Sequence, residues 1–372
     1  MSKVMLIGLG RVGWQVMEYL VQDPRCPELI CCDISPEGKY LVDNAVIGAG
    51  ITGLFPSVKY YQLNLADIDA TTQIIREEKP DVIIDMSVMM PMHGFYKLPK
   101  EQFDILYSAT FGAWLPCQVA LPYRLMQALK KSGVKAHVLT SGLPDLVIPA
   151  LASVGMAPTI GMGNINLNTA ALTILVSRKL NVPAECVKIY LVCEHAWVVY
   201  PRDSAYQKTP YFLKIMVNDK DVTGQFDTDQ LMWDAIKLYP PAPSTVFYTG
   251  SSKSIINNMY ALLSPVGKFT HAPGPKGLPG GYPVIISSNG VELALPEGIT
   301  EKEAVAINTE AQRIGEGIES INPDGTCVWT DYAHKILKDL LGFDHKSFKV
   351  SESYEIALEM KEKYNHFLSR YC

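Results

Sequence analysis

The sequence predicts an α/β fold built on a doubly wound parallel sheet, with a second, α+β domain and a helical C-terminal tail. Short apolar segments typical of buried strands alternate with helical segments through the first part of the chain. Strands that alternate with helices in this way form parallel sheets. After about residue 146 the alternation weakens, and a charged helical pattern ends the chain. We therefore expect one domain at residues 1-145, a second at 146-325 and a C-terminal extension at 326-372.

The composition limits the class of protein. With 372 residues, 48% of them hydrophobic, the chain is long enough to bury a substantial core. Its net charge of -5 and its scattered basic residues favour neither nucleic acid nor an anionic membrane as a partner. No apolar stretch is long enough to span a bilayer, and the first residues enter a strand directly, so we expect a cytoplasmic protein. The eight cysteines lack metal-type spacing, and no metal is expected.

The expected elements follow from apolar periodicity and turn signals. In the first half we expect strands at 4-7, 28-32, 58-62, 82-86 and 137-140, and helices at 14-21, 71-78 and 117-131. In the second half we expect helices at 168-180, 253-263 and 301-319, a strand at 187-193, a hairpin around residues 289-290 and a helical tail at about 331-368.

A glycine-rich motif follows the first strand. The segment Gly8-Leu9-Gly10-Arg11-Val12-Gly13 lies directly between this strand and a helix, the context that a dinucleotide-binding turn requires. Gly8 permits the tight turn, Gly10 lets the backbone approach a pyrophosphate, and Gly13 lets the helix pack closely on the strand. The helix N-terminus would then hold the phosphates.

The next strand leads into Asp33, about twenty residues beyond the last glycine. A carboxylate in that position can accept hydrogen bonds from an adenosine ribose, and it repels a 2′-phosphate. The motif is therefore of the Rossmann type and favours NAD over NADP. Further cofactor contacts are expected from Arg11, Val12, Ile34 and Ser87, although Arg11 fits an exposed helix position equally well.

Two later segments resemble the lactate and malate dehydrogenase family. Residues 161-172 (GMGNINLNTAAL) resemble the family's G-x-G…L-D-x-x-R-F stretch, and Cys193-Glu194-His195 resembles its G-E-H-G-D-S stretch. Residues 280-292 and 301-315 resemble the family's closing hairpin and last helix, so the resemblance spans approximately residues 3 to 318. It implies an NAD-dependent dehydrogenase with His195 as the acid/base residue. We also expect a homodimer or homotetramer.

The departures from the family bear on the substrate. Asn168 stands where the family has the aspartate that orients the histidine, and Ala171 stands where an arginine binds the substrate carboxylate. Asn168 is expected to fix a His195 tautomer by hydrogen bonding, with a histidine pKa lower than the family's. Without the arginine the bidentate charge-assisted pair is lost, so we expect neither lactate nor malate as the substrate.

A bulkier ketone or secondary alcohol is the expected substrate. The expected pocket residues, besides Ala171, are Met89, Ser141, Trp197 and Lys253. His93 is a secondary proton donor, and Lys97 or Arg202 are further candidates to bind an anionic group. Glu194 is expected to point away from His195, because neighbouring side chains on a regular strand face opposite ways.

Two alternatives remain open at this stage. Residues 58-85 also resemble saccharopine-dehydrogenase-type or epimerase-type Rossmann domains, although the carboxyl half fits those proteins less well. A protein that binds NAD without transferring hydride would also explain the missing family charges. NADH binding measured by fluorescence, together with His195→Ala tested on any substrate found, separates them, because a sensor binds the cofactor but transfers no hydride.

Overall fold

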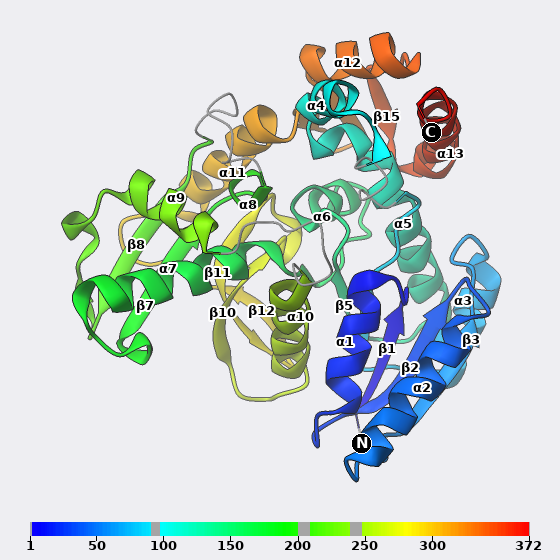
Figure 1. Cartoon of the computed structure of the whole chain (residues 1–372), viewed down its shortest axis with the longest axis horizontal. Coiled ribbons are helices and arrows are strands. Elements are labelled where there is room, and N and C mark those ends of the chain that lie inside the picture. Colours follow the sequence, from blue (N-terminus) through cyan, green and yellow to red (C-terminus); the bar gives the residue numbers. More distant parts are fainter. Residues whose placement is uncertain (1, 91–96, 200–208, 239–247, 372) are drawn as a thin grey trace.

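A six-stranded parallel sheet organises the first part of the molecule (Figure 1). The computed structural model describes residues 2–90, 97–199, 209–238 and 248–371. The strands lie in the order β3-β2-β1-β4-β5-β6. Their bounds are β1 Lys3–Ile7, β2 Glu28–Asp33, β3 Val58–Gln62, β4 Val82–Asp85, β5 His137–Thr140 and β6 Ile160–Gly161. The predicted doubly wound sheet is confirmed, and it takes its sixth strand from beyond residue 145.

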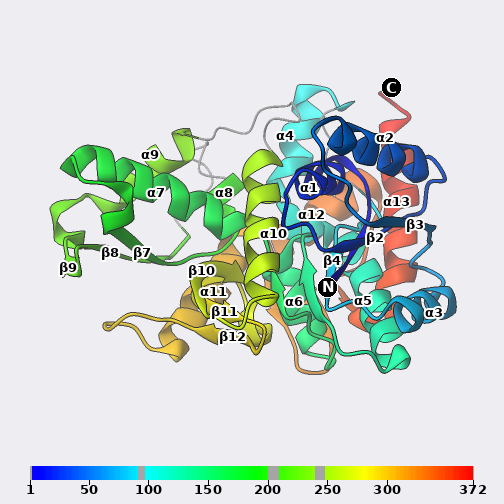
Figure 2. The same ribbon diagram turned by 90° about the horizontal axis from the view of Figure 1, so that it is seen from below.

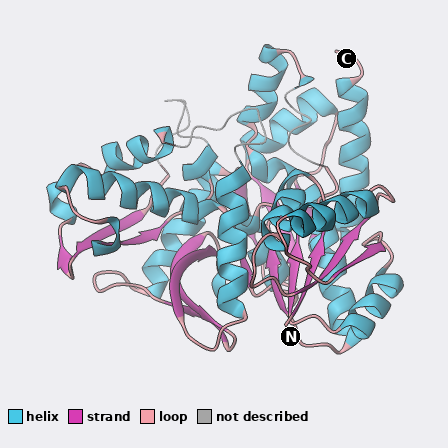
Figure 3. Cartoon of the chain, turned by 60° about the horizontal axis from the view of Figure 1, so that its bottom comes forward, coloured by secondary structure: helices cyan, strands magenta, loops and turns pink. Residues whose placement is uncertain are grey.

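Helices cover both faces of this sheet, because its strands are apolar on both faces (Figure 3). Cys31 packs in one apolar cluster with α1 (Arg11–Val21) and α10 (Tyr248–Leu262). The neighbouring Cys32 packs in another cluster on the opposite face. That cluster includes residues of α3 (Ile68–Glu78) and α5 (Leu115–Ser132), and α2 (Gly38–Ile51) lies on the α1 side.

Two antiparallel sheets form the second part of the molecule, on the left of Figure 1. One consists of β7 (Val187–Val192), β8 (Phe212–Val217) and β9 (Lys220–Asp221), covered by α7 (Asn164–Leu180) and α9 (Thr228–Lys237). The other consists of β10 (Lys268–Pro273), β11 (Gly281–Ser287) and β12 (Gly290–Leu293). α6 (Pro144–Ala152) follows β5, α8 (Ala196–Val199) follows β7, and α11 (Glu301–Gly315) follows the hairpin.

The C-terminal segment is helical, as predicted, and also contains three short strands. β13 (Ile318–Ile321), β14 (Thr326–Trp329) and β15 (Ser347–Lys349) form an antiparallel sheet beside α12 (Asp331–Leu341) and α13 (Ser353–Leu368). The predicted helix 301-319 was therefore too long: it ends at Gly315, and Gly317 has a positive φ of 68°. The predicted helical tail was too continuous, because Gly342, at a φ of 66°, ends α12.

This segment packs on the first part of the molecule rather than extending from it. α13 lies along α5 (Figure 2). Ala357, Met360, Tyr364 and Phe367 form its buried face, and the Tyr364 ring meets the Trp114 ring edge-on at 5.6 Å. α4 (Lys100–Ser108) and the 3-10 turn η2 (Phe111–Trp114) belong to the same apolar cluster.

The surface of α2 is unusually apolar. Tyr40, Ile47, Ile51 and the following Phe55 are between 64% and 85% exposed. Among the described residues, no helix combines the length and the apolar character needed to cross a bilayer.

The packing of α13 predicts a stability difference within one helix. Met360 is fully buried, so Met360→Ala should lower the free energy of unfolding by about 2–5 kcal/mol through lost contacts and a cavity. Leu358 on the same helix is 47% exposed, and Leu358→Ala should change the free energy of unfolding by about 0.5 kcal/mol or less. Urea denaturation of both variants measures the difference. Equal effects would mean that α13 does not pack on α5.

Candidate functional site

The glycine-rich turn joins β1 to α1 with no space for larger side chains at two of its glycines. Gly8 has a φ of 90°, which favours glycine. A Cβ on Gly13 would lie 1.9 Å from the carbonyl oxygen of Gly8, so α1 can approach β1 only because Gly13 has no side chain. A Cβ on Gly10 would meet nothing within 4 Å. The turn is therefore tightly packed on its protein side and open at Gly10.

Asp33 ties this turn to the end of β2. Its Oδ2 accepts a hydrogen bond from the Leu9 backbone N–H at 2.6 Å, and its Oδ1 accepts one from the Ser35 N–H at 2.8 Å. Each carboxylate oxygen keeps a further lone pair for a ligand. Of the other predicted cofactor contacts, Arg11 is exposed, Val12 is half-buried and Ile34 is 63% exposed.

A buried carboxylate, Asp85, lies at the end of β4 and was not predicted as a site residue. It accepts hydrogen bonds from both the backbone N–H and the hydroxyl of Ser87, at 3.0 and 2.5 Å, and from the Thr140 hydroxyl at 3.2 Å. The Ser141 hydroxyl donates to the Asp85 carbonyl oxygen at 3.3 Å. Burial raises the pKa of Asp85 to about 6, although the Ser87 and Thr140 hydrogen bonds oppose this shift. Asp85 thus joins predicted cofactor residue Ser87 to predicted pocket residue Ser141.

His195 lies just beyond the end of β7 and is paired with a carboxylate. Its Nδ1 forms a hydrogen bond with Oε1 of Glu316 at 2.7 Å. His195 is 8% exposed and Glu316 is fully buried. The Phe111 ring lies against the imidazole, with ring centroids 5.6 Å apart. The two paired residues are 121 positions apart in the sequence, so only the fold brings them together.

The backbone of η2 holds the Glu316 carboxylate in place. Oε2 of Glu316 accepts a hydrogen bond from the Gly112 N–H at 3.2 Å. A Cβ on Gly112 would lie 2.1 Å from the Glu316 carbonyl oxygen, so this close approach requires glycine. Trp329 of β14 donates its indole N–H to the Gly112 carbonyl at 2.9 Å. The end of α11 therefore supplies Glu316, and Trp329 of the C-terminal segment fixes the turn that holds it.

Two further carboxyl groups affect the pKa values of His195 and Glu316. Asp145 and Glu194 are each 1% exposed. Burial, followed by the neighbouring carboxyl groups, raises the pKa of Glu194 and of Glu316 well above the ordinary value for glutamate. Burial also lowers the pKa of His195, against the opposing effects of Glu194 and Asp145. These shifts favour the uncharged forms of the histidine and of both glutamates.

Two sequence expectations about this histidine were wrong. The group on its Nδ1 is Glu316 and not Asn168, whose side-chain amide instead donates to Cys193 Sγ at 3.8 Å. Glu194 does not point away from His195: β7 ends at Val192, so strand alternation no longer applies, and Glu194 and His195 ligand atoms lie within 4.8 Å. Burial lowers the pKa of His195 below the ordinary histidine value, and a pKa lower than the family's stays a prediction.

The predicted pocket residues are not all in one place. Ala171 and Trp197 are buried in the same apolar cluster. Met89 packs against the cluster formed by α4, α5 and the C-terminal segment. Lys253 is exposed on α10, with its ammonium group 3.8 Å from the centre of the Tyr19 ring of α1. Lys97 is exposed, and His93 and Arg202 lie outside the described residues.

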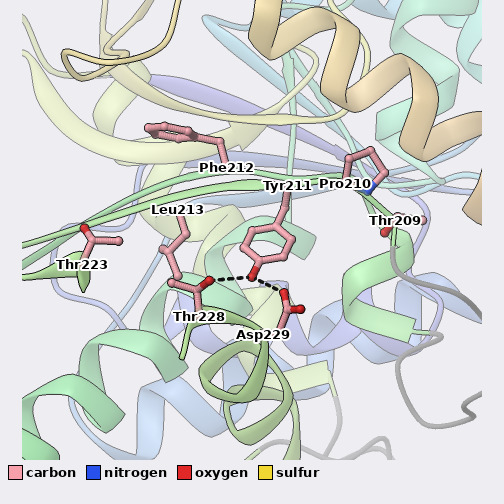
Figure 4. Close-up of a pocket in the computed structure, with 8 residues that line it drawn as sticks. All are labelled: Thr209, Pro210, Tyr211, Phe212, Leu213, Thr223, Thr228 and Asp229. Atoms are coloured by element: carbon pink, nitrogen blue, oxygen red, sulfur yellow. Dashed lines mark hydrogen bonds between the residues drawn. The ribbon is translucent and has the colours of Figure 1, made fainter. Parts of the chain in front are cut away.

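A hollow of about 530 Å³ lies near Trp197 (Figure 4). It is lined by residues 209-213, Thr223, Thr228 and Asp229, and the Tyr211 hydroxyl, inside it, hydrogen-bonds with Thr228 and Asp229 at 3.1 and 2.7 Å. The Trp197 indole N–H donates to the Thr209 carbonyl at the rim, at 2.9 Å. Burial raises the pKa of Tyr211, so its hydroxyl remains protonated.

Sequence reasoning missed Asp85, Asp145 and Glu316. The signal for Glu316 was its position between Gly315 and Gly317 at the end of a helix, where a small-residue context permits close packing. Asp85 ended a fully apolar strand, where a carboxylate must find buried donors. No comparable local signal marks Asp145.

The parallel sheet, the glycine-rich turn and the separate antiparallel part define a two-part α/β protein whose first part has a Rossmann-type fold. More specifically, the chain has the fold of the lactate and malate dehydrogenases, as its motifs predicted, and is similar in sequence to one of them. No family model matches the sequence.

The similar proteins agree on this fold. The chain is 23% identical to L-lactate dehydrogenase 2 of Listeria innocua over 340 residues, which cover 86% of this chain and 99% of that protein. Lactate dehydrogenase of Eimeria maxima, crystallised with NADH and oxamate, has 14% identity and a TM-score of 0.57, covering 84% of this chain and 92% of that one. Malate dehydrogenase of Plasmodium falciparum in complex with NADH has 16% identity and a TM-score of 0.56, with 84% and 95% coverage.

The environment of Asp85 predicts a pH-dependent effect on stability. Because its pKa is raised from 3.8 to about 6, the uncharged carboxyl group stabilises the fold below about pH 4, and this contribution is lost as the pH rises through 6. Asp85→Asn remains uncharged and keeps an acceptor for Ser87. The variant should therefore exceed the wild type in unfolding free energy by about 1–3 kcal/mol at pH 8. Denaturant titrations at pH 8 and pH 4 test this, and the gap must close at pH 4.

Proposed function

We propose that the chain is an NAD-dependent oxidoreductase that transfers a hydride between nicotinamide and a secondary alcohol or ketone. The observation that carries the proposal is the buried His195–Glu316 pair, which occurs in a fold shared with enzymes crystallised with NADH. A histidine in hydrogen-bonding contact with a carboxyl group can donate and accept the proton that such a reaction requires. His195 is thus the proposed acid/base residue, and Glu316 is its positioning residue.

The residues of the turn fit a dinucleotide. Space is open at Gly10, the N-terminus of the 11-residue helix α1 follows, and Asp33 has lone pairs available at the end of β2. Gly10 and the first residues of α1 would hold the pyrophosphate, and Asp33 would accept hydrogen bonds from the ribose and disfavour a 2′-phosphate. When bound, NAD supplies the hydride acceptor or donor.

Proton transfer follows from the pKa directions of the pair. With the uncharged forms of both groups favoured, the Glu316 carboxyl O–H donates to Nδ1 of His195, and Nε2 carries the ring proton. During ketone reduction Nε2 gives its proton to the substrate oxygen, and Nδ1 takes the proton of Glu316. The resulting carboxylate is stabilised by the Gly112 N–H. Alcohol oxidation reverses these transfers.

The substrate is proposed to be bulkier than lactate or malate. Ala171 provides no positive charge for a small carboxylate, and its neighbour in the same apolar cluster is Trp197. Met89 and Ser141 remain predicted pocket residues. Asn168 stays a secondary candidate for a positioning residue, because its hydrogen bond to Cys193 can orient the segment that carries His195.

A protein that binds NAD without turnover remains the second candidate, because two charged positions of the dehydrogenase family are replaced here by Asn168 and Ala171. The saccharopine-dehydrogenase-type alternative is less well supported, since the similarity to a lactate dehydrogenase extends over 86% of the chain.

A cytoplasmic location and a homodimer or homotetramer remain predictions. The exposed apolar residues of α2 are the surface that we expect self-association to cover.

Cofactor binding has a direct test in the glycine-rich turn. The wild type should bind NADH, observed as a change in its fluorescence. Gly13→Ala should weaken this binding at least about tenfold, because the new methyl group would collide with the Gly8 carbonyl and displace α1. Gly48→Ala is the matched control: a Cβ there meets nothing within 4 Å, and NADH affinity should not change. Absence of NADH binding by the wild type refutes the cofactor assignment.

Catalysis is tested with NADH and a panel of ketones that includes pyruvate and oxaloacetate. For the best substrate found, His195→Asn should lower kcat by about 10²–10⁴-fold. Glu316→Gln should lower kcat less and alter its pH profile while KM changes little. His345→Asn removes a histidine from a partly exposed pair with Glu359 and should leave kcat unchanged. Efficient turnover of pyruvate or oxaloacetate would contradict the bulkier substrate, and NADH binding without any turnover would favour the second candidate.

A further inference from the structure

We propose that Glu194, His195 and Glu316 form a binding site for a divalent transition-metal cation. One ligand atom from each of the three side chains lies within 4.8 Å of the other two, and all three residues are buried. Glu194 and His195 come from the segment after β7, and Glu316 comes from the end of α11. The proposal goes beyond the proposed function, because metal binding requires neither NAD nor a substrate.

The unsatisfied oxygen of Glu194 is the observation that points to a ligand. Oε2 of Glu194 accepts a hydrogen bond from the Ala196 N–H at 2.7 Å, but Oε1 is buried without a hydrogen-bond partner among the described residues. The residue is only 1% exposed. A buried polar atom without a partner costs free energy, and a carboxylate oxygen left in this way is an available metal ligand. A cation between the three side chains would give this oxygen a partner and remove the free-energy cost.

The acidic character of the cluster also favours a cation. Within the described part of the chain, no lysine or arginine forms an ion pair with Glu194 or Glu316. The carboxyl group of Asp145 adds a further acidic group whose charge acts on both glutamates. Buried carboxylates need either protons or a metal to compensate their charge. A divalent cation between the three side chains would compensate this acidic cluster.

The donor set indicates which cations fit. One imidazole nitrogen and two carboxylate oxygens suit Zn²⁺, Mn²⁺ or Co²⁺ better than a soft cation that requires thiolates. Three protein ligands leave a coordination position for the oxygen of an alcohol or ketone, which a metal polarises as a Lewis acid. The cysteine spacing predicted no metal site, but this cluster uses no cysteine and is assembled only in the folded chain.

Metal titration of the full chain tests the proposal. After treatment with a chelator and dialysis, the protein is titrated with Zn²⁺ by calorimetry and with Co²⁺ by visible absorption. We expect one cation to bind per chain. Glu194→Gln and Glu316→Gln should each weaken binding at least about tenfold. Glu359→Gln removes a carboxylate from the partly exposed His345 pair and should leave the affinity unchanged, which makes it the matched control.

Two results would overturn the site: no binding of Zn²⁺, Co²⁺ or Mn²⁺ by the folded wild type, or binding that neither glutamine variant weakens. Circular dichroism establishes that each variant is folded. If Glu316→Gln does not fold, Glu194→Gln decides the question alone, and Zn²⁺ should then raise the melting temperature of the wild type but not of that variant. NADH binding is measured separately, so a failure of the metal site is distinguishable from a failure of the proposed function.

Discussion

The hydrogen bond between His195 and Glu316 is the interaction on which the arrangement of this molecule depends. It joins the segment after β7 to the end of α11, and its carboxylate is held by the backbone of η2. The surrounding groups are buried, so each must find a partner or remain uncharged. Three regions that are distant in the sequence therefore have to be positioned together around one imidazole. The tight contacts of Gly112 with Glu316 and Trp329 are consequences of this requirement.

Features that depend on residues close together in the chain could be predicted from the sequence. Strands β3 and β5 were predicted with their observed bounds, because each is a short segment with strand-forming residues that is bounded by turn signals. The glycine-rich turn was equally accessible, since Gly8 and Gly13 are required by backbone geometry within a few residues of each other. The order of motifs around His195 was enough to identify the dehydrogenase-like fold.

Features set by distant contacts could not be predicted. Asn168 was the expected partner of His195 by analogy, but the structure pairs His195 with Glu316, which lies 121 positions away and was expected only as part of a helix at residues 301-319. Glu194 was misplaced because nothing in its neighbours reveals that β7 ends at Val192. Similarly, no local pattern indicates that β14 follows α11 and returns to η2. In each case the deciding contact lies far away along the chain.

The position of Glu316 and Trp329 within the chain has a consequence for biosynthesis. During translation the glycine-rich turn emerges first and can pack against β2 early, because its partners are close in sequence. His195 follows, but the carboxylate that it contacts is synthesised 121 residues later. Until then the imidazole and the other buried carboxyl groups lack their final surroundings. The glycine-rich turn is therefore synthesised first, and the histidine site is complete only after Glu316 and Trp329 have been made.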